Sequence, residues 1–169
     1  GAVAAHFKNA SIDVTIMDTN APLVDAICQT GIRLSGAMEL KSRPIMAYAS
    51  ADEAFKDRKR FDVVFVSVKE PINHLVVQDA AALLCKGGMA VRFQNGIDTE
   101  LELLAAVGAN QTLRGVCNYA GGPTGLGGFD VVFNHAPNFV GAVNEKNKQA
   151  LEGARMVADL MNTSGLETA

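Results

Sequence analysis

Short apolar segments rich in β-branched residues alternate with helical patterns along the chain, and this alternation constrains the fold more than any other feature. The clearest strand pattern, FDVVFVSV, covers residues 61–68, and an amphipathic helical pattern follows over residues 71–85. A second pair comprises a strand pattern at 89–93 and a helical pattern at 98–107. A strand that is apolar almost throughout is typical of one buried on both faces of a parallel sheet. The alternation predicts right-handed βαβ units and a doubly wound, mostly parallel α/β sheet.

The other patterns extend this architecture. Asn20 and Ser50 are expected to cap two helices, and Gly31 is expected to end the first of them. The last three strands are not separated by long helices, which predicts an antiparallel or mixed extension of the sheet. A Gly-rich stretch at 121–128 is expected to be a turn-rich link. The further strands are expected at 12–17, 32–34, 41–49, 113–118, 130–133 and 139–143, and the further helices at 1–9, 20–31, 51–56 and 146–162.

Composition excludes several partners. The formal net charge of -3 over 169 residues gives no broad attraction for nucleic acid or anionic lipid. No apolar run approaches the roughly 20 residues that a membrane-spanning helix needs. Cys28, Cys85 and Cys117 are widely spaced and lie in or beside apolar runs, so we expect reduced core thiols and a cytoplasmic location. The three histidines have no ligand-like spacing, so no metal site is expected.

The start of the chain has features of a dinucleotide site. Gly1, Ala2, Val3 and Ala4 match the end of a Gly-rich turn that leads from a first strand into a helix, where backbone N–H groups meet a pyrophosphate. Small residues at a helix start are equally explained by close packing. Asp18 follows the next strand pattern, at the spacing where a carboxylate accepts hydrogen bonds from the adenosine ribose.

The residues after Asp18 bear on the kind of cofactor. They are Thr19 and Asn20, and neither is a cation that could bind a 2′-phosphate. The carboxylate would also repel that phosphate, so NAD is favoured over NADP. A strand-end or capping Asp is the simpler alternative, but the order of helix start, strand and acid favours nucleotide binding.

Two polar residues follow neighbouring strand patterns. Lys69 comes directly after the 61–68 segment, and Asn95, in the sequence QNG, comes after the 89–93 segment. Ligands of doubly wound sheets bind at the carboxyl ends of the strands. An exposed Lys or an Asn-Gly turn alone is commonplace, but together they predict contacts to a cofactor or substrate.

These motifs occur in the order GAVA, FDVVFVSVK, VRFQNGID and LRGVCNYAGG, and the chain resembles the ketopantoate reductases over nearly its whole length. The resemblance implies a Rossmann-like fold and NAD(P)-dependent reduction of a 2-oxo acid, 2-dehydropantoate or a related substrate, by hydride transfer. It implies that residues 1–4 contact the pyrophosphate and that Lys69 and Asn95 face the nicotinamide ribose and the substrate. Gly121 would offer a backbone group to the cofactor. The chain departs from the family at Ala4, where a Gly is usual, and at Thr19, where NADP-type members carry an Arg.

The resemblance also implies a domain plan. Residues 1–143 are expected to form a dinucleotide-binding Rossmann domain whose first strand is missing, and residues 144–169 a helix that leads to an absent, helical C-terminal domain. The family's proton-donating Lys lies in that domain, so the fragment alone is expected to be inactive. A homodimer remains an open expectation, as does the identity of the substrate.

Two alternatives remain open. A regulatory module that senses nucleotides would share the Gly turn and Asp18 but would not call for Lys69 and Asn95 at neighbouring strand ends. Another dehydrogenase of the β-hydroxyacid type would share the whole plan.

Overall fold

The computed structural model describes residues 1–57, 59–69 and 72–169. Pro71, the predicted start of the helix over 71–85, lies outside the described residues. The chain divides into two compact units. The first unit comprises Gly1–Asp57, Asn118–Pro137 and Met161–Glu167, and the second comprises Arg58–Cys117, Asn138–Leu160 and Thr168–Ala169.

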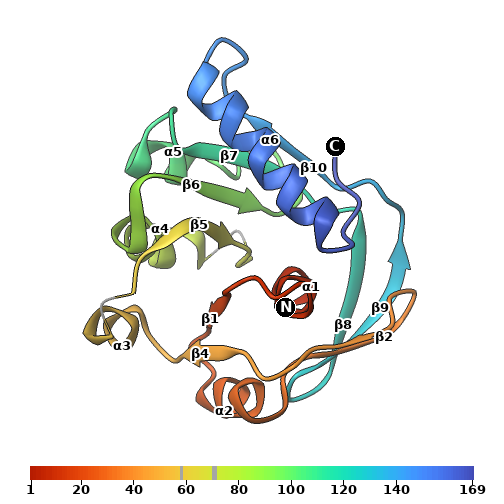
Figure 1. Cartoon of the computed structure of the whole chain (residues 1–169). Coiled ribbons are helices and arrows are strands. Elements are labelled where there is room, and N and C mark those ends of the chain that lie inside the picture. The colour runs from red at the N-terminus through yellow and green to blue at the C-terminus, as the bar shows by residue number, and fades with distance from the viewer. Residues whose placement is uncertain (58, 70–71) are drawn as a thin grey trace. The chain divides into compact units, whose positions relative to one another are not determined.

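The first unit contains two small sheets and three helices (Figure 1). One sheet is a parallel pair, and the other is a mixed four-stranded sheet in the order β3-β2-β9-β8, in which β2 and β9 are parallel and the other pairs antiparallel. The strands are β1 (Thr15–Met17), β2 (Arg33–Gly36), β3 (Leu40–Lys41), β4 (Met46–Tyr48), β8 (Tyr119–Gly125) and β9 (Gly128–Asn134). The helices are α1 (Ala2–Asn9), α2 (Ala21–Thr30) and α3 (Ala51–Lys56).

Local sequence determines the helix ends of this unit as predicted. The Asn20 Oδ1 atom accepts a hydrogen bond from the Leu23 N–H at 3.3 Å, and the Ser50 Oγ atom accepts one from the Glu53 N–H at 3.4 Å. Gly31 ends α2 with a φ of 77°, a conformation that costs glycine little. Both predicted caps are therefore confirmed.

The second unit contains a four-stranded sheet in the order β10-β7-β6-β5. The strands β5, β6 and β7 are parallel, and β10 is antiparallel to β7, which confirms the predicted antiparallel extension. The strands are β5 (Phe61–Val66), β6 (Leu84–Phe93), β7 (Thr112–Val116) and β10 (Phe139–Ala142). The helices are α4 (Asn73–Leu83), α5 (Leu101–Val107) and α6 (Lys148–Thr163), of which α6 continues into the first unit from Met161.

Helices cover both faces of this sheet. Ala90 on β6 is buried in a cluster with Val77 of α4 and Leu103 of α5. The preceding residue, Met89, points to the opposite face because side chains alternate along a strand. There it meets α6, where a Cβ atom added to Gly153 would lie 2.3 Å from the Met89 sulfur. The sheet is thus sandwiched between helices, and the fold is α/β and Rossmann-like, as predicted.

Two strand predictions were wrong. The Gly-rich stretch at 121–128 is not a turn-rich link, because residues up to Gly125 form β8 and pair with β9. Glycines supply the backbone groups for strand pairing as well as other residues do, so the turn-like composition of this stretch concealed the strand. The 61–68 segment is not buried on both faces either. Its strand ends at Val66 and lies at an edge of its sheet, so only Val66 is fully buried in it.

One burial prediction also needs correction. None of the three free cysteines is fully buried, and Cys28 is exposed on α2. On α6, Met156 is 44% exposed, whereas Val157 is completely buried. Within the described residues, no helix is long and apolar enough to cross a membrane.

Candidate functional site

The first candidate element is the N-terminal end of α1, at residues 1–4. No side chain caps this end, and its first turn contains no acidic residue. In α1 the Ala5 N–H donates to the Gly1 carbonyl at 3.1 Å, and the N–H groups of a first helical turn have no carbonyl one turn earlier in the helix to bond. Gly1 is exposed, and a Cβ atom there would meet nothing within 4 Å. The arrangement offers N–H groups and a positive helix end to an anion.

Asp18 lies directly after β1, as predicted, and is exposed. Its Oδ1 atom accepts a hydrogen bond from the Asn20 N–H at 2.9 Å, which shapes the turn into α2. Its own N–H donates to the Tyr48 carbonyl of β4 at 3.1 Å, so the residue is held on both sides. The carboxylate therefore has a defined position at the carboxyl end of β1.

The strand β4, whose Tyr48 carbonyl accepts the Asp18 N–H, also contributes to a strong phenol–carboxylate pair. The Tyr48 hydroxyl donates to the Asp57 Oδ2 atom at 2.6 Å. This hydrogen bond, together with burial of the phenol and the nearby negative charge, raises the pKa of Tyr48 to about 12. The pair ties β4 to the residue that follows α3.

Lys69 and Asn95 both belong to the second unit, and both are exposed. Lys69 lies three residues beyond the end of β5, and its carbonyl accepts from the Ile72 N–H at 3.1 Å. Asn95 lies two residues beyond the end of β6. Because β5 and β6 are parallel neighbours (Figure 1), the two residues follow the same edge of one sheet.

The Asn95 amide makes a contact that the sequence did not predict. Its Nδ2 atom donates to the Cys117 carbonyl at 2.8 Å, and its Oδ1 atom accepts from the Cys117 N–H at 2.9 Å. The Asn95 side chain thus bonds both backbone groups of Cys117, just beyond β7, as the backbone of a neighbouring strand would. An amide has a second N–H and a second acceptor lone pair, so this pairing leaves hydrogen-bonding capacity for a ligand.

Two arginines that the sequence analysis missed hold the loop that begins at Asn95. Arg92 is completely buried on β6 and donates to the Thr99 carbonyl of this loop and to the Val66 carbonyl at the end of β5. Arg114 on β7 forms an ion pair with Glu100, with 2.9 Å between Nη1 and Oε2, and also donates to the Gly96 carbonyl. In the sequence, the two arginines stand out as charged residues within apolar strand patterns. Their hydrogen-bond partners lie far away in the sequence, so the pattern alone did not show what they bind.

Gly121 lies in β8, at a position where the neighbouring strand β9 comes unusually close. A Cβ atom at this position would lie 1.8 Å from the Asp130 carbonyl oxygen of β9. The β8–β9 register also shifts between Ala120 and Gly121. Only glycine therefore fits without moving the backbone, and this close approach explains the residue independently of any ligand.

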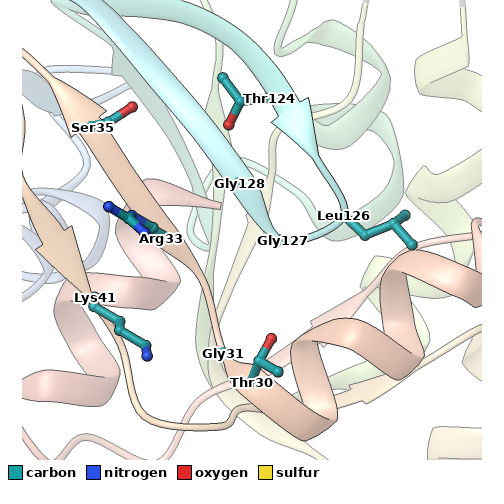
Figure 2. Close-up of a pocket in the computed structure, with 9 residues that line it drawn as sticks. All are labelled: Thr30, Gly31, Arg33, Ser35, Lys41, Thr124, Leu126, Gly127 and Gly128. Atoms are coloured by element: carbon teal, nitrogen blue, oxygen red, sulfur yellow. The ribbon is translucent and has the colours of Figure 1, made fainter.

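A hollow lies elsewhere in the first unit. It has a volume of about 490 Å³ and is lined by residues of α2, β2, β3 and the β8–β9 turn, among them Thr30, Arg33 and Lys41 (Figure 2). It lies at the C-terminal end of α2, whereas Asp18 lies before the N-terminal end of this ten-residue helix, about 15 Å away at 1.5 Å per residue. None of the predicted site residues lines it. Among the described residues, no cluster of three or more His, Cys, Asp or Glu could hold a metal ion.

The fold and its strand order define an α/β protein of the doubly wound, Rossmann-like class. The ketopantoate reductase PanE/ApbA family model matches residues 1–144. The chain belongs to this family. No curated protein sequence matches it significantly.

Solved structures with the same fold are similar in shape and distant in sequence. One, from Enterococcus faecalis, is provisionally assigned as a 2-dehydropantoate 2-reductase and matches with a TM-score of 0.83 at 17% identity, covering 99% of this chain and 52% of that one. A 2-dehydropantoate 2-reductase from Porphyromonas gingivalis W83 matches with a TM-score of 0.80 at 12% identity, covering 100% and 59%. The ternary structure of D-mandelate dehydrogenase with NADH and anilino(oxo)acetate matches with a TM-score of 0.81 at 19% identity, covering 99% and 52%. At these identities the likeness shows the fold, and the chain spans about half the length of these structures.

Proposed function

We propose that this chain is the cofactor-binding part of an NAD(P)H-dependent oxidoreductase of the ketopantoate reductase type. The proposed reaction reduces a 2-oxo acid, 2-dehydropantoate to pantoate or a related substrate. The observation that carries the proposal is the family match over residues 1–144 in a Rossmann-like fold. The D-mandelate dehydrogenase structure, which holds NADH and an oxo acid together, supports the same class of ligands.

The residues at the start of the first unit fit a dinucleotide. The N–H groups of residues 1–4 are proposed to bind the pyrophosphate, because α1 has neither a side-chain cap nor an acid in its first turn. The Asp18 carboxylate, held by the Asn20 N–H, is proposed to accept hydrogen bonds from the adenosine ribose hydroxyls. Gly121 is proposed to offer a backbone group to the cofactor, a role in addition to its packing against β9.

The strand ends of the second unit are proposed to orient the reacting groups. The reduced nicotinamide, when bound, supplies the hydride. Lys69 is proposed to place a positive charge near the nicotinamide ribose and the substrate, where it would stabilise negative charge on the substrate oxygens. The Asn95 amide, fixed by its two bonds to Cys117, is proposed to hydrogen-bond the same ligands through its remaining N–H and lone pair.

We infer a preference for NAD over NADP. Asp18 would repel a 2′-phosphate on the ribose whose hydroxyls it binds. Thr19 and Asn20 follow it, and the Asn20 side chain is already used to cap α2. The hollow that Arg33 and Lys41 line lies beyond the far end of α2.

The test uses the full-length protein. Calorimetric titration with NADH and with NADPH gives the two dissociation constants, and the absorbance of the reduced nicotinamide follows turnover with a panel of 2-oxo acids. We expect tighter binding of NADH and reduction of at least one branched 2-oxo acid. Binding without turnover of any oxo acid would favour the regulatory nucleotide-sensing module instead. We include a cytoplasmic location in the proposal, since free thiols at Cys28, Cys85 and Cys117 accord with a reducing compartment.

A further inference from the structure

The sheet of the second unit contains a buried arginine. Arg92 lies on β6 between Val91 and Phe93, and its side chain is completely inaccessible to solvent. A buried guanidinium is unfavourable unless its N–H groups find acceptors, so its retention in a strand core requires specific partners. The hydrogen-bond acceptors of the Arg92 guanidinium therefore indicate its role.

The Arg92 guanidinium donates to three separate segments of the second unit. Its Nη1 and Nη2 atoms donate to the Val66 and Val68 carbonyls at the end of β5, each at 3.0 Å. Its Nε atom donates to the Thr99 carbonyl, before α5, at 3.2 Å, and Nη2 also donates to the Gln94 side-chain oxygen. The guanidinium is planar and its donors have fixed directions, so it holds these segments in one relative position.

Two of these partners adjoin residues of the proposed site. Val68 directly precedes Lys69, and Gln94 directly precedes Asn95. Thr99 lies at the other end of the loop that Asn95 begins, and it is itself 3% exposed. One side chain therefore connects the backbone that carries Lys69 with the loop that carries Asn95.

We propose that Arg92 is the positioning residue that sets the distance between Lys69 and Asn95, and this proposal rests on the proposed function above. Arg92 does not touch the ligands itself. It acts through the Val68 carbonyl on one side and through Gln94 and Thr99 on the other. Arg114 supports the same loop from β7 but makes no described contact with the end of β5, so it does not replace this link.

Two variants separate positioning from folding. Arg92→Met replaces the guanidinium side chain by an apolar one of similar length and leaves no buried charge, so it is expected to fold. Arg92→Lys keeps the charge but replaces the fork with one ammonium that cannot reach all three segments. Arg155→Lys, an exposed position on α6, is the matched control.

The assay uses the full-length protein, NADH or NADPH and a reducible 2-oxo acid. We expect both Arg92 variants to lower kcat/KM by about 10- to 100-fold, the size expected when a closed site loses a well-placed hydrogen bond. Binding of ADP-ribose, which needs only the residues proposed to hold the adenosine and pyrophosphate, should change less than about twofold. The double variant Arg92→Met with Asn95→Ala should have a kcat/KM only slightly below that of Asn95→Ala alone. The loss should be much smaller than the product of the two single effects, because both residues act through one loop.

Hydrogen exchange gives a readout independent of turnover. Amides in residues 66–69 and 94–100 should exchange faster in Arg92→Met, and the β8–β9 pair should be unchanged. A folded Arg92→Met protein with wild-type kcat/KM and wild-type exchange would overturn the proposal. A wild-type protein that reduces no 2-oxo acid would refute the proposed function instead, and the exchange data would then decide whether Arg92 holds the two segments together.

Discussion

Replacement of Asn95 by alanine tests the proposed site most directly, because this residue has one contact in the fold and one proposed role toward the ligands, and the two are separable. Asn95→Ala removes both hydrogen bonds to Cys117, at 2.8 and 2.9 Å. Each such bond contributes about 0.5–1.5 kcal/mol, and water replaces part of it because the side chain is exposed. We therefore expect the free energy of unfolding to fall by about 1–2 kcal/mol. Loss of the proposed contacts to cofactor and substrate should also lower kcat/KM by about 10- to 100-fold, or roughly 1–3 kcal/mol.

The two effects are measured by urea unfolding and by steady-state kinetics on the full-length protein. Asn95→Asp is the informative companion, since it keeps an acceptor for the Cys117 N–H but sets a carboxylate oxygen against the Cys117 carbonyl. It should be at least as destabilising as the alanine variant. A loss of stability with wild-type kinetics would show that the amide serves the fold alone. Unchanged stability and unchanged kinetics would refute the reasoning altogether.

Three further predictions concern the first unit. Gly121→Ala should lower the free energy of unfolding by about 1–3 kcal/mol, measured in urea, because the added Cβ meets a carbonyl oxygen of β9. Gly122→Ala is the control and should have little effect, since a Cβ there meets nothing within 4 Å. Equal effects of the two changes would contradict the packing argument. The paired change Asp18→Ser with Thr19→Arg should shift the ratio of the NADH and NADPH dissociation constants toward NADPH by about tenfold, and an unchanged ratio would reject the ribose assignment. The Tyr48 phenol has a pKa of about 12 against an ordinary 10.0, so its neutral, hydrogen-bonded form contributes stability that is complete below pH 10 and declines as the pH rises toward 12. The difference in unfolding free energy between wild type and Tyr48→Phe should therefore be smaller at about pH 11 than at about pH 9, and a constant difference would argue against this pair.

The parts of the fold that depend on near neighbours in sequence were predictable. Asn20 and Ser50 cap helices because each side chain reaches an N–H three residues ahead, and Gly31 ends α2 through its own conformation. Lys69 and Asn95 could be placed at one sheet edge because parallel strands order their ends in the same way.

The parts that depend on distant contacts were not predictable. The sequence GGPTG at 121–125 has turn composition, and only its pairing with β9 makes it a strand. The chain gives no local sign that Asn95 pairs with Cys117, 22 residues away. Arg92 interrupts an apolar strand, and its burial follows from carbonyls as far as Val66, 26 residues away. Each miss involves a backbone partner whose position the tertiary fold decides.

The loop after β6 is held more firmly than a turn between a strand and a helix requires. Asn95 is paired with Cys117, the Gly96 carbonyl is bound by Arg114, and the Thr99 carbonyl is bound by Arg92. Within the same loop Asp98 has a φ of 57°, a conformation that non-glycine residues seldom adopt, and the loop retains it because these bonds hold both of its ends. A connection needs only to reverse the chain, and a few flexible residues achieve that. Fixed polar groups at the carboxyl edge of a doubly wound sheet are what hydride transfer between two small ligands requires, since a misplacement of about 1 Å costs about 100-fold in rate. The concentration of bonds on this loop therefore supports the proposed role in ligand positioning, since chain reversal alone does not require it.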